Sequence, residues 1–135
     1  SFHVTGVQTC ALPISSTPAQ YGFLAGLTGP RDWMDEYRQK ILEQRDYCVT
    51  RINDIDGMET ETPDGAFYMF PKLSREKWAK DDKQFVLDLL HQEHVLLVHG
   101  SGFSREYGSG HVSIVFLPGK EILEEAFDRI NRFMN

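Results

Sequence analysis

The C-terminal end of the chain carries the clearest helical pattern in the sequence. Its apolar residues recur at helical spacing on one face, and they are Ile122, Leu123, Ala126, Phe127, Ile130, Phe133 and Met134. The opposite face is charged, and the i,i+4 ion pairs expected there are Glu125–Arg129 and Asp128–Arg132. Because each large apolar side chain contributes about 1.5–3 kcal/mol when it is buried, the apolar face needs a packing partner. We expect that partner to be a β-sheet.

A second long helix is expected over residues 31–54. Its apolar residues follow spacings of three, four and seven, and they are Trp33, Tyr37, Ile41, Cys48, Ile52 and Ile55. The pair Asp56-Gly57 ends this helix. A shorter helix at 21–27 precedes it and is weakened by two glycines.

Short strands separate the helices. Residues 58–62 and 65–70 are expected to form a hairpin around the turn Pro63-Asp64, and Pro71 ends its second strand. A helix capped by Asp81 follows, and further strands are expected at 95–98 and 111–117. This order predicts an α/β protein with an α+β layer, in which helices cover a small, mostly antiparallel sheet.

Composition limits the classes of partner. The 135 residues carry a formal net charge of −6, which argues against nucleic acid and anionic membranes as partners. No apolar run approaches the roughly 18 residues of a membrane-spanning helix. The two cysteines, Cys10 and Cys48, form neither a disulfide framework nor a metal-binding pattern. We therefore expect a protein of the reducing cytoplasm, without a Cys10–Cys48 bridge.

Residues 1–15 are expected not to be native. They show neither helical nor strand periodicity and lack the basic segment of a signal peptide. They resemble the peptide obtained when sequencing-adapter DNA is translated. A genuine extended arm is the alternative. The domain is therefore expected to occupy residues 16–135.

Several patterns that carry chemistry in other proteins are incomplete here. In the loop at 100–105, Arg105 stands where a dinucleotide-binding loop requires glycine, and the loop leads into a strand. His91, His94 and His99 lack the spacing and partners of a zinc site, so no metal site is expected. The lysines lie in polar surroundings and none is expected to form a Schiff base. Reasoning from these residues identifies no catalytic residue.

Two segments, taken in order, carry a more specific signal. They are Pro63-Asp64-Gly65-Ala66-Phe67-Tyr68-Met69-Phe70-Pro71 and His111-Val112-Ser113-Ile114-Val115-Phe116-Leu117-Pro118. Between them lie the strand at 95–98 and Gly100-Ser101-Gly102-Phe103. This combination resembles the C-terminal small domain of class I/II aminotransferases, which use pyridoxal 5'-phosphate (PLP) and belong to fold type I. The alanine and aspartate aminotransferases are the most similar branches.

The resemblance implies an activity for an intact enzyme. Such an enzyme would move an amino group between an amino acid and a 2-oxo acid through PLP. The family's Schiff-base lysine and other PLP-binding residues would precede residue 16, so no catalytic or cofactor-binding residue is assigned in this chain. We expect a fragment that lacks the N-terminal large domain and is inactive alone. A homodimer is expected for the family.

The resemblance also implies three substrate-binding positions. Ser113 matches the position at which the family has an arginine that clamps the substrate α-carboxylate. Serine offers one neutral hydroxyl where arginine offers a bidentate charged fork. A reading error, an altered substrate preference or a degenerate copy would each account for the serine. Phe67 and Gly102 are expected to border the substrate cleft, against a core aromatic and a plain turn as the alternatives.

A different class of function remains open at this stage. The chain could be a small non-enzymatic α+β domain that binds a partner. Such a domain would cover its core fully. A fragment would instead expose apolar surface on the helix from Trp33 to Ile55.

Overall fold

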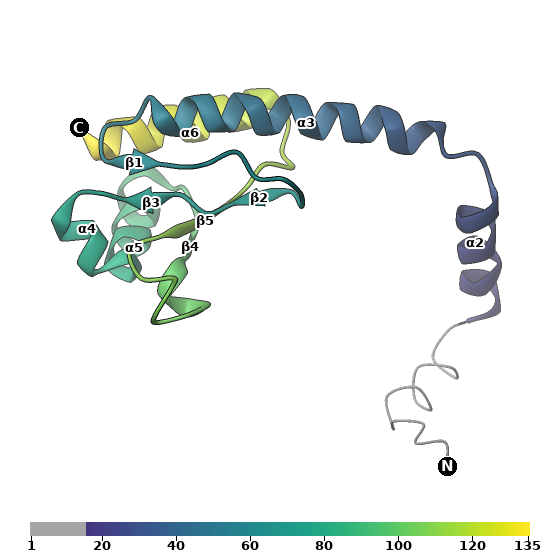
Figure 1. The fold of residues 1–135 in the computed structure, drawn as a ribbon, viewed down its shortest axis with the longest axis horizontal. Coiled ribbons are helices and arrows are strands. Elements are labelled where there is room, and N and C mark those ends of the chain that lie inside the picture. Colours follow the sequence, from purple (N-terminus) through teal and green to yellow (C-terminus); the bar gives the residue numbers. More distant parts are fainter. Residues whose placement is uncertain (1–15) are drawn as a thin grey trace, which may run out of the picture. The chain divides into compact units, whose positions relative to one another are not determined.

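The computed structural model describes residues 16–135, which fall into two compact units with a boundary between Glu36 and Tyr37. Residues 1–15, including Cys10, lie outside the described residues, and their proposed non-native origin stays a prediction. Each unit is described separately. Figure 1 gives the labels of the helices and strands.

The first unit contains helix α2 (Thr17–Thr28) and the start of helix α3 (Asp32–Asn53). Helix α2 begins with a proline in its first turn, as proline's fixed backbone angle allows. It is longer than the helix expected at 21–27. None of its residues is buried, and its exposed apolar side chains include Tyr21 and Phe23.

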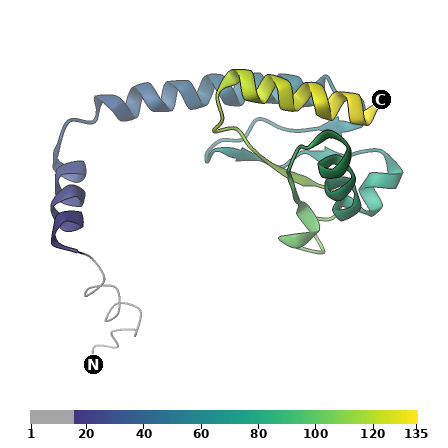
Figure 2. The ribbon, with the colours of Figure 1, turned by 180° about the vertical axis from the view of Figure 1, so that it is seen from behind.

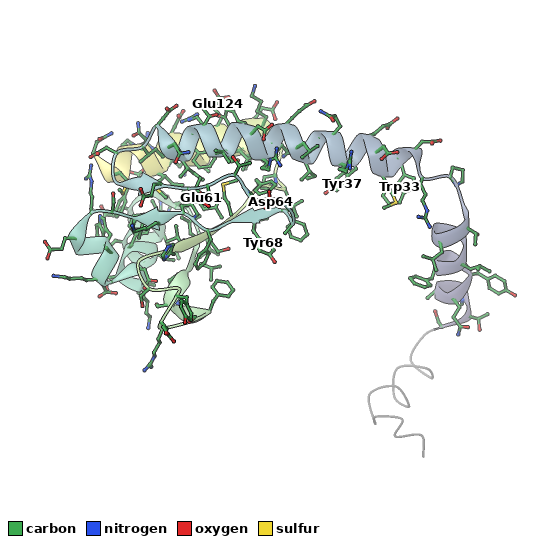
Figure 3. All side chains as sticks on the ribbon, viewed as in Figure 1. Trp33, Tyr37, Glu61, Asp64, Tyr68 and Glu124 are labelled. Carbon is green, nitrogen blue, oxygen red and sulfur yellow. The ribbon has the colours of Figure 1, made fainter. Side chains whose placement is uncertain are left out.

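Helix α3 confirms the long helix expected over residues 31–54. Its C-terminal half packs into the core of the second unit through Cys48 and Ile52. Its N-terminal end exposes large aromatic side chains, since Trp33 is 61% exposed and Tyr37 is 51% exposed (Figure 3). The apolar stripe that predicted the helix is therefore only partly covered.

The strands are short and every ladder is antiparallel, as predicted. The strands are β1 (Met58–Glu59), β2 (Tyr68–Met69), β3 (Lys72–Leu73), β4 (Val98–His99) and β5 (Val112–Val115). Strand β5 lies between β2 and β4, and β1 pairs with β3. A single bridge between Lys72 and His111 joins the two groups of strands.

The prediction of a hairpin between residues 58–62 and 65–70 is wrong. Strand β1 pairs with β3 and strand β2 pairs with β5, so the two expected partners do not pair with each other. Strand β2 does end before Pro71, as predicted, and the chain then continues as β3, while the Pro71 carbonyl accepts a hydrogen bond from Val112. Pairing β1 with β3 places Met58 opposite Leu73, and both side chains are buried. Core packing, rather than the local turn, selects the partner.

Helices cover one face of the strands. The remaining helices are α4 (Glu76–Lys80), α5 (Asp82–Glu93), the 3₁₀ turn η1 (Gly100–Gly102) and α6 (Lys120–Met134). The strands lie in front of α5 in Figure 1, and α5 lies in front of the strands when the molecule is turned, where α6 runs in front of α3 (Figure 2). Helix α5 packs against both α6 and β4, and Phe85, Phe116 and Phe127 are fully buried.

The C-terminal helix has the predicted buried stripe with one error. Leu123, Phe127, Ile130 and Met134 are buried, but Ile122 is 64% exposed. The Glu125–Arg129 ion pair is confirmed at 2.8 Å. The prediction of an Asp128–Arg132 ion pair is wrong, because each of these two residues pairs with a residue of another helix. Asp128 accepts from Arg51 of α3 at 2.6 Å, and Arg132 donates to Glu93 at the end of α5 at 2.8 Å.

We expect the Glu93–Arg132 contact to make stability depend on acidic pH. The hydrogen bond from Arg132 lowers the pKa of Glu93 below its usual range. A carboxylate with a lowered folded-state pKa stabilises the fold above its unfolded-state pKa, and this contribution is lost as the pH falls through the folded-state value. The Glu93→Gln variant should have a lower free energy of unfolding than the unchanged chain near neutral pH. This difference should become smaller below about pH 4.3. Urea unfolding at stepped pH checks this, and a constant difference down to pH 3 would contradict it.

Candidate functional site at strand β5

Strand β5 separates the core from an open cleft. Val112 and Ile114 point into the core, while the alternate residues Ser113 and Val115 line a cavity of about 1240 Å³ together with His111 just before the strand. We call this cavity the β5 cleft. Its other walls include Tyr68 and Phe70 around β2 and Phe103 after η1. Its volume exceeds the roughly 300–1,000 Å³ of typical ligand pockets. The cleft is open, and the described residues form one side of it.

One rim of the cleft is acidic. The connection from β1 to β2 contributes Glu59, Glu61 and Asp64 to the lining. Figure 3 shows Glu61 and Asp64 on this connection, near Tyr68. Lys72 is the one cationic residue of the lining, and its ammonium lies 3.0 Å from a carboxylate oxygen of Glu59. The described part of the wall therefore offers an anion no unpaired positive charge.

Aromatic contacts fix the other side of the cleft. The His111 ring is stacked on Phe70 with centroids 5.2 Å apart and planes 7° apart. Phe70 in turn meets Phe103 edge to face at 5.9 Å. Nδ1 of His111 lies 2.9 Å from the carbonyl oxygen of Ser109, so Nδ1 carries the proton and donates it. The ring is thus held on one face and at one nitrogen.

A buried carboxylate holds the loop that carries Phe103. Asp82, only 4% exposed, accepts hydrogen bonds from the backbone N–H and the hydroxyl of Ser101, each at 2.7 Å. Because the Ser101 hydroxyl donates to Asp82, it accepts from Nδ1 of His99 at 3.0 Å. This chain of bonds ties the start of α5 to η1. Reasoning from the sequence missed Asp82, since an acidic residue in the first turn of a helix is usually a solvated charge.

Glycines allow the same loop to close. A Cβ atom on Gly100 would lie 2.2 Å from the carbonyl oxygen of Gly108, and one on Gly108 would lie 2.0 Å from that of Gly100. Neither position therefore has room for a larger residue. This explains the glycines by close backbone approach and not by phosphate binding.

The three predicted substrate-binding positions lie in different surroundings. Ser113 lines the β5 cleft, half-buried on β5. Gly102 lies against the His99 ring and is not among the cleft-lining residues. Phe67 is also outside the lining; it is 46% exposed and meets Tyr68 edge to face at 5.6 Å. The structure therefore brings Ser113 to the cleft without the other two.

The one lysine that lines the β5 cleft does not fit the covalent attachment of PLP. Covalent attachment needs an amine, and the lining lysine, Lys72, is 57% exposed and paired with Glu59. A phosphate would need free backbone N–H groups, but that of Ser101 is already donated to Asp82. Within residues 16–135, no group of three or more His, Cys, Asp and Glu side chains could hold a metal ion. In the same range, no helix has the length and apolar character to cross a membrane.

Comparison with known proteins gives a consistent result. Residues 6–130 match the family model described as aminotransferase class I and II. The chain is 44% identical over 97 residues to a glutamate-pyruvate aminotransferase of Haemophilus influenzae, covering 71% of this chain and 24% of that protein. It is 34% identical over 119 residues to an aspartate aminotransferase of Bacillus subtilis, covering 86% of this chain and 30% of that protein.

Solved structures share the fold. An alanine aminotransferase from Pyrococcus furiosus superposes with a TM-score of 0.83 and 58% identity, over 88% of this chain and 30% of that one. An aspartate aminotransferase from Rhizobium meliloti gives a TM-score of 0.82 at 31% identity, over 93% of this chain and 33% of that one. The chain thus spans about a quarter to a third of the length of these relatives.

Proposed function

Because the chain belongs to the aminotransferase class I and II family, we propose that it forms the C-terminal small domain of an enzyme that transfers an amino group between an amino acid and a 2-oxo acid. The observation that carries this proposal is the β5 cleft, which this fold builds with Ser113 in its wall. In the proposed enzyme, PLP supplies the electron-withdrawing group for amino transfer. Since the exposed, paired Lys72 does not suit its covalent attachment, the proposal assigns the binding of PLP to other parts of the intact enzyme.

The same proposal assigns the partners. The substrates are an amino acid of the alanine or aspartate type and a 2-oxo acid, and the cleft of the small domain closes against a large domain. The exposed apolar side chains of α2 and of the N-terminal end of α3 support docking of a further domain or a second subunit. These exposed residues also favour the enzyme over a self-contained binding domain, whose core would be fully covered.

A reducing cytoplasm is part of the proposal. Cys48 is a free cysteine, fully buried among apolar side chains. Burial raises the pKa of its thiol to about 12, so the reactive thiolate is not populated at neutral pH. This cysteine acts as a packing residue and supports neither a disulfide nor catalysis.

Ser113, Gly102 and Phe67 keep the roles that the family resemblance implies. Ser113 offers the substrate carboxyl end one hydroxyl. Gly102 and Phe67 lie outside the cleft lining and act next to it, Gly102 beside the lining residue Phe103 and Phe67 through its contact with Tyr68. An arginine at position 113 would add charged hydrogen bonds, each contributing about 1.5–3 kcal/mol. The serine therefore weakens carboxylate binding.

A chimera tests the proposal. Residues 16–135 replace the matching segment of the Pyrococcus furiosus alanine aminotransferase, with Ser113 or with Ser113→Arg. Both folded proteins should transfer amino groups from alanine to 2-oxoglutarate, and Ser113→Arg should lower the KM for alanine roughly tenfold or more. Ser113→Ala serves as the control and should leave KM close to that of the serine form. Absence of activity in both folded chimeras would refute the function; an unchanged KM would refute the role of position 113.

A further inference from the structure

We propose that Asp82 is a positioning residue of the β5 cleft, which acts through Ser101 to hold Phe103 where the ring contacts the aliphatic side chain of the amino acid substrate. This inference rests on the proposed function and deepens it, because it assigns the contact for the substrate side chain. The carboxyl end of the substrate stays with Ser113.

The carboxylate of Asp82 anchors η1 to a rigid helix. It is only 4% exposed, and its two oxygens accept separately from the backbone N–H and from the hydroxyl of Ser101, each at 2.7 Å. Hydrogen bonds to a charged group contribute more than those between neutral groups. Asp82 lies in the first turn of α5, which the buried side chains of Phe85 and Leu89 fix in the core.

His99 completes the hold on η1. Its Nδ1 lies 3.0 Å from the Ser101 hydroxyl, which donates to Asp82 and therefore accepts from His99. The imidazole ring packs over Gly102, where a Cβ atom would lie only 2.9 Å from Cε1 of the ring. The carboxylate thus sets the direction of both hydrogen bonds, and the glycine leaves room for the ring.

The position of η1 is passed to Phe103, the residue that follows it. The backbone N–H of Phe103 donates to the Gly100 carbonyl at 2.9 Å, and its ring meets Phe70 edge to face at 5.9 Å. Phe70 also lies against Gly100, since a Cβ atom there would be 2.8 Å from the tip of the ring. Phe103 is 67% exposed and lines the β5 cleft, so most of its ring is open to a ligand.

An exposed aromatic ring suits the apolar part of a substrate. Phe103 and Ser113 line the same cleft, so an amino acid whose carboxyl end lies at Ser113 has its side chain within this cleft. Contact between an aliphatic group and the ring removes apolar surface from water. A methyl group, as in alanine, is therefore the simplest side chain for Phe103 to contact.

Steady-state kinetics of the chimera with the Pyrococcus furiosus alanine aminotransferase test the inference. Phe103→Ala and Asp82→Ala should each raise the KM for alanine roughly threefold and leave kcat within about twofold, because each removes a contact with the bound side chain. The double variant should show no further rise, since Asp82 acts through Phe103. Asp88→Ala on the same helix is the control and should leave KM unchanged. Circular dichroism confirms that each variant is folded at the assay temperature.

Asp82→Asn tests the hydrogen bonds themselves and keeps the size of the side chain. The amide oxygen accepts from the Ser101 N–H, and the amide nitrogen donates to the hydroxyl, which then donates to Nδ1 of His99. The KM for alanine should stay within about twofold of the unchanged chimera. In long-range ¹H–¹⁵N spectra of the labelled chain at about pH 8, where imidazole side chains are ordinarily neutral, the His99 proton should move from Nδ1 to Nε2.

Three results would each overturn the inference: an unchanged KM in Asp82→Ala, a further rise in the double variant, or an unchanged His99 tautomer in Asp82→Asn. Any of them in an active parent chimera would leave the proposed function standing. A folded parent chimera without activity would overturn the proposed function and this inference with it.

Discussion

Replacing Phe85 with alanine (Phe85→Ala) should lower the free energy of unfolding by about 3–5 kcal/mol, the range observed for large-to-small changes of buried aromatic residues. Phe85 is fully buried on α5. Its ring meets Trp78 of α4 and Phe133 of α6 edge to face, with centroids 5.5 Å apart in each pair. One ring thus joins three helices, and its loss leaves a cavity that none of them can fill alone.

Urea unfolding followed by circular dichroism measures this effect. The matched control is Leu87→Ala on the same helix, where the side chain is 38% exposed. We expect the control to lose about 1 kcal/mol or less, since little apolar surface leaves the core there. Equal losses in the two variants would show that α5 does not pack through Phe85.

Asp82→Ala should lower the free energy of unfolding by about 2–4 kcal/mol, because it removes two hydrogen bonds to a buried carboxylate and leaves the Ser101 groups unsatisfied. The loss should be concentrated in η1 and the segment that leads to Phe103. The amide of Ser101 should therefore exchange with solvent much faster than in the unchanged chain. Hydrogen-exchange mass spectrometry measures this together with urea unfolding.

Asp88→Ala provides the matched control for Asp82. Asp88 lies on the same helix, and within the described part of the chain the one donor to its carboxylate is the Gln84 side chain, at 2.7 Å. Its removal should cost about 0.5 kcal/mol or less and leave the exchange of Ser101 unchanged. An unchanged rate of hydrogen exchange at the Ser101 amide in Asp82→Ala would show that the carboxylate does not hold the loop.

Periodic segments of this fold could be predicted from sequence because their signal is local. The apolar spacing of Leu123, Phe127 and Ile130 requires only that one helix face be buried, and it is. The same reasoning located α3 to within a residue or two. The spacing alone does not say that Trp33 and Tyr37 stay exposed; the expectation of exposed apolar surface on this helix came from the family resemblance, which implied a fragment.

Contacts between segments far apart in the chain could not be predicted from local sequence patterns. Asp128 and Arg132 have the spacing of a helical ion pair, yet Arg51 and Glu93 reach them from other helices. The Pro63-Asp64 turn suggested a hairpin, although burial of Met58 and Leu73 pairs β1 with β3. In each case a local rule gave way to packing between elements far apart in the chain.

The candidate site shows the same division. Ser113 was singled out through the family resemblance, and it lines the cleft. His111 was part of the same segment, but its contacts with Ser109 and Phe70 could not be read from the sequence. Asp82 gains its role from Ser101, which lies on another element. The sequence gives the chemistry of each side chain, whereas the contacts between side chains depend on the fold.

In the proposed enzyme, residues 16–135 form one wall of the substrate cleft and do not anchor the cofactor. Incubation of the chain with equimolar PLP, reduction with borohydride and peptide mapping test it most directly. We expect no lysine to be modified in preference to the others and no stoichiometric absorbance of a lysine adduct. Stoichiometric labelling of one lysine, Lys72 above all, would contradict the account.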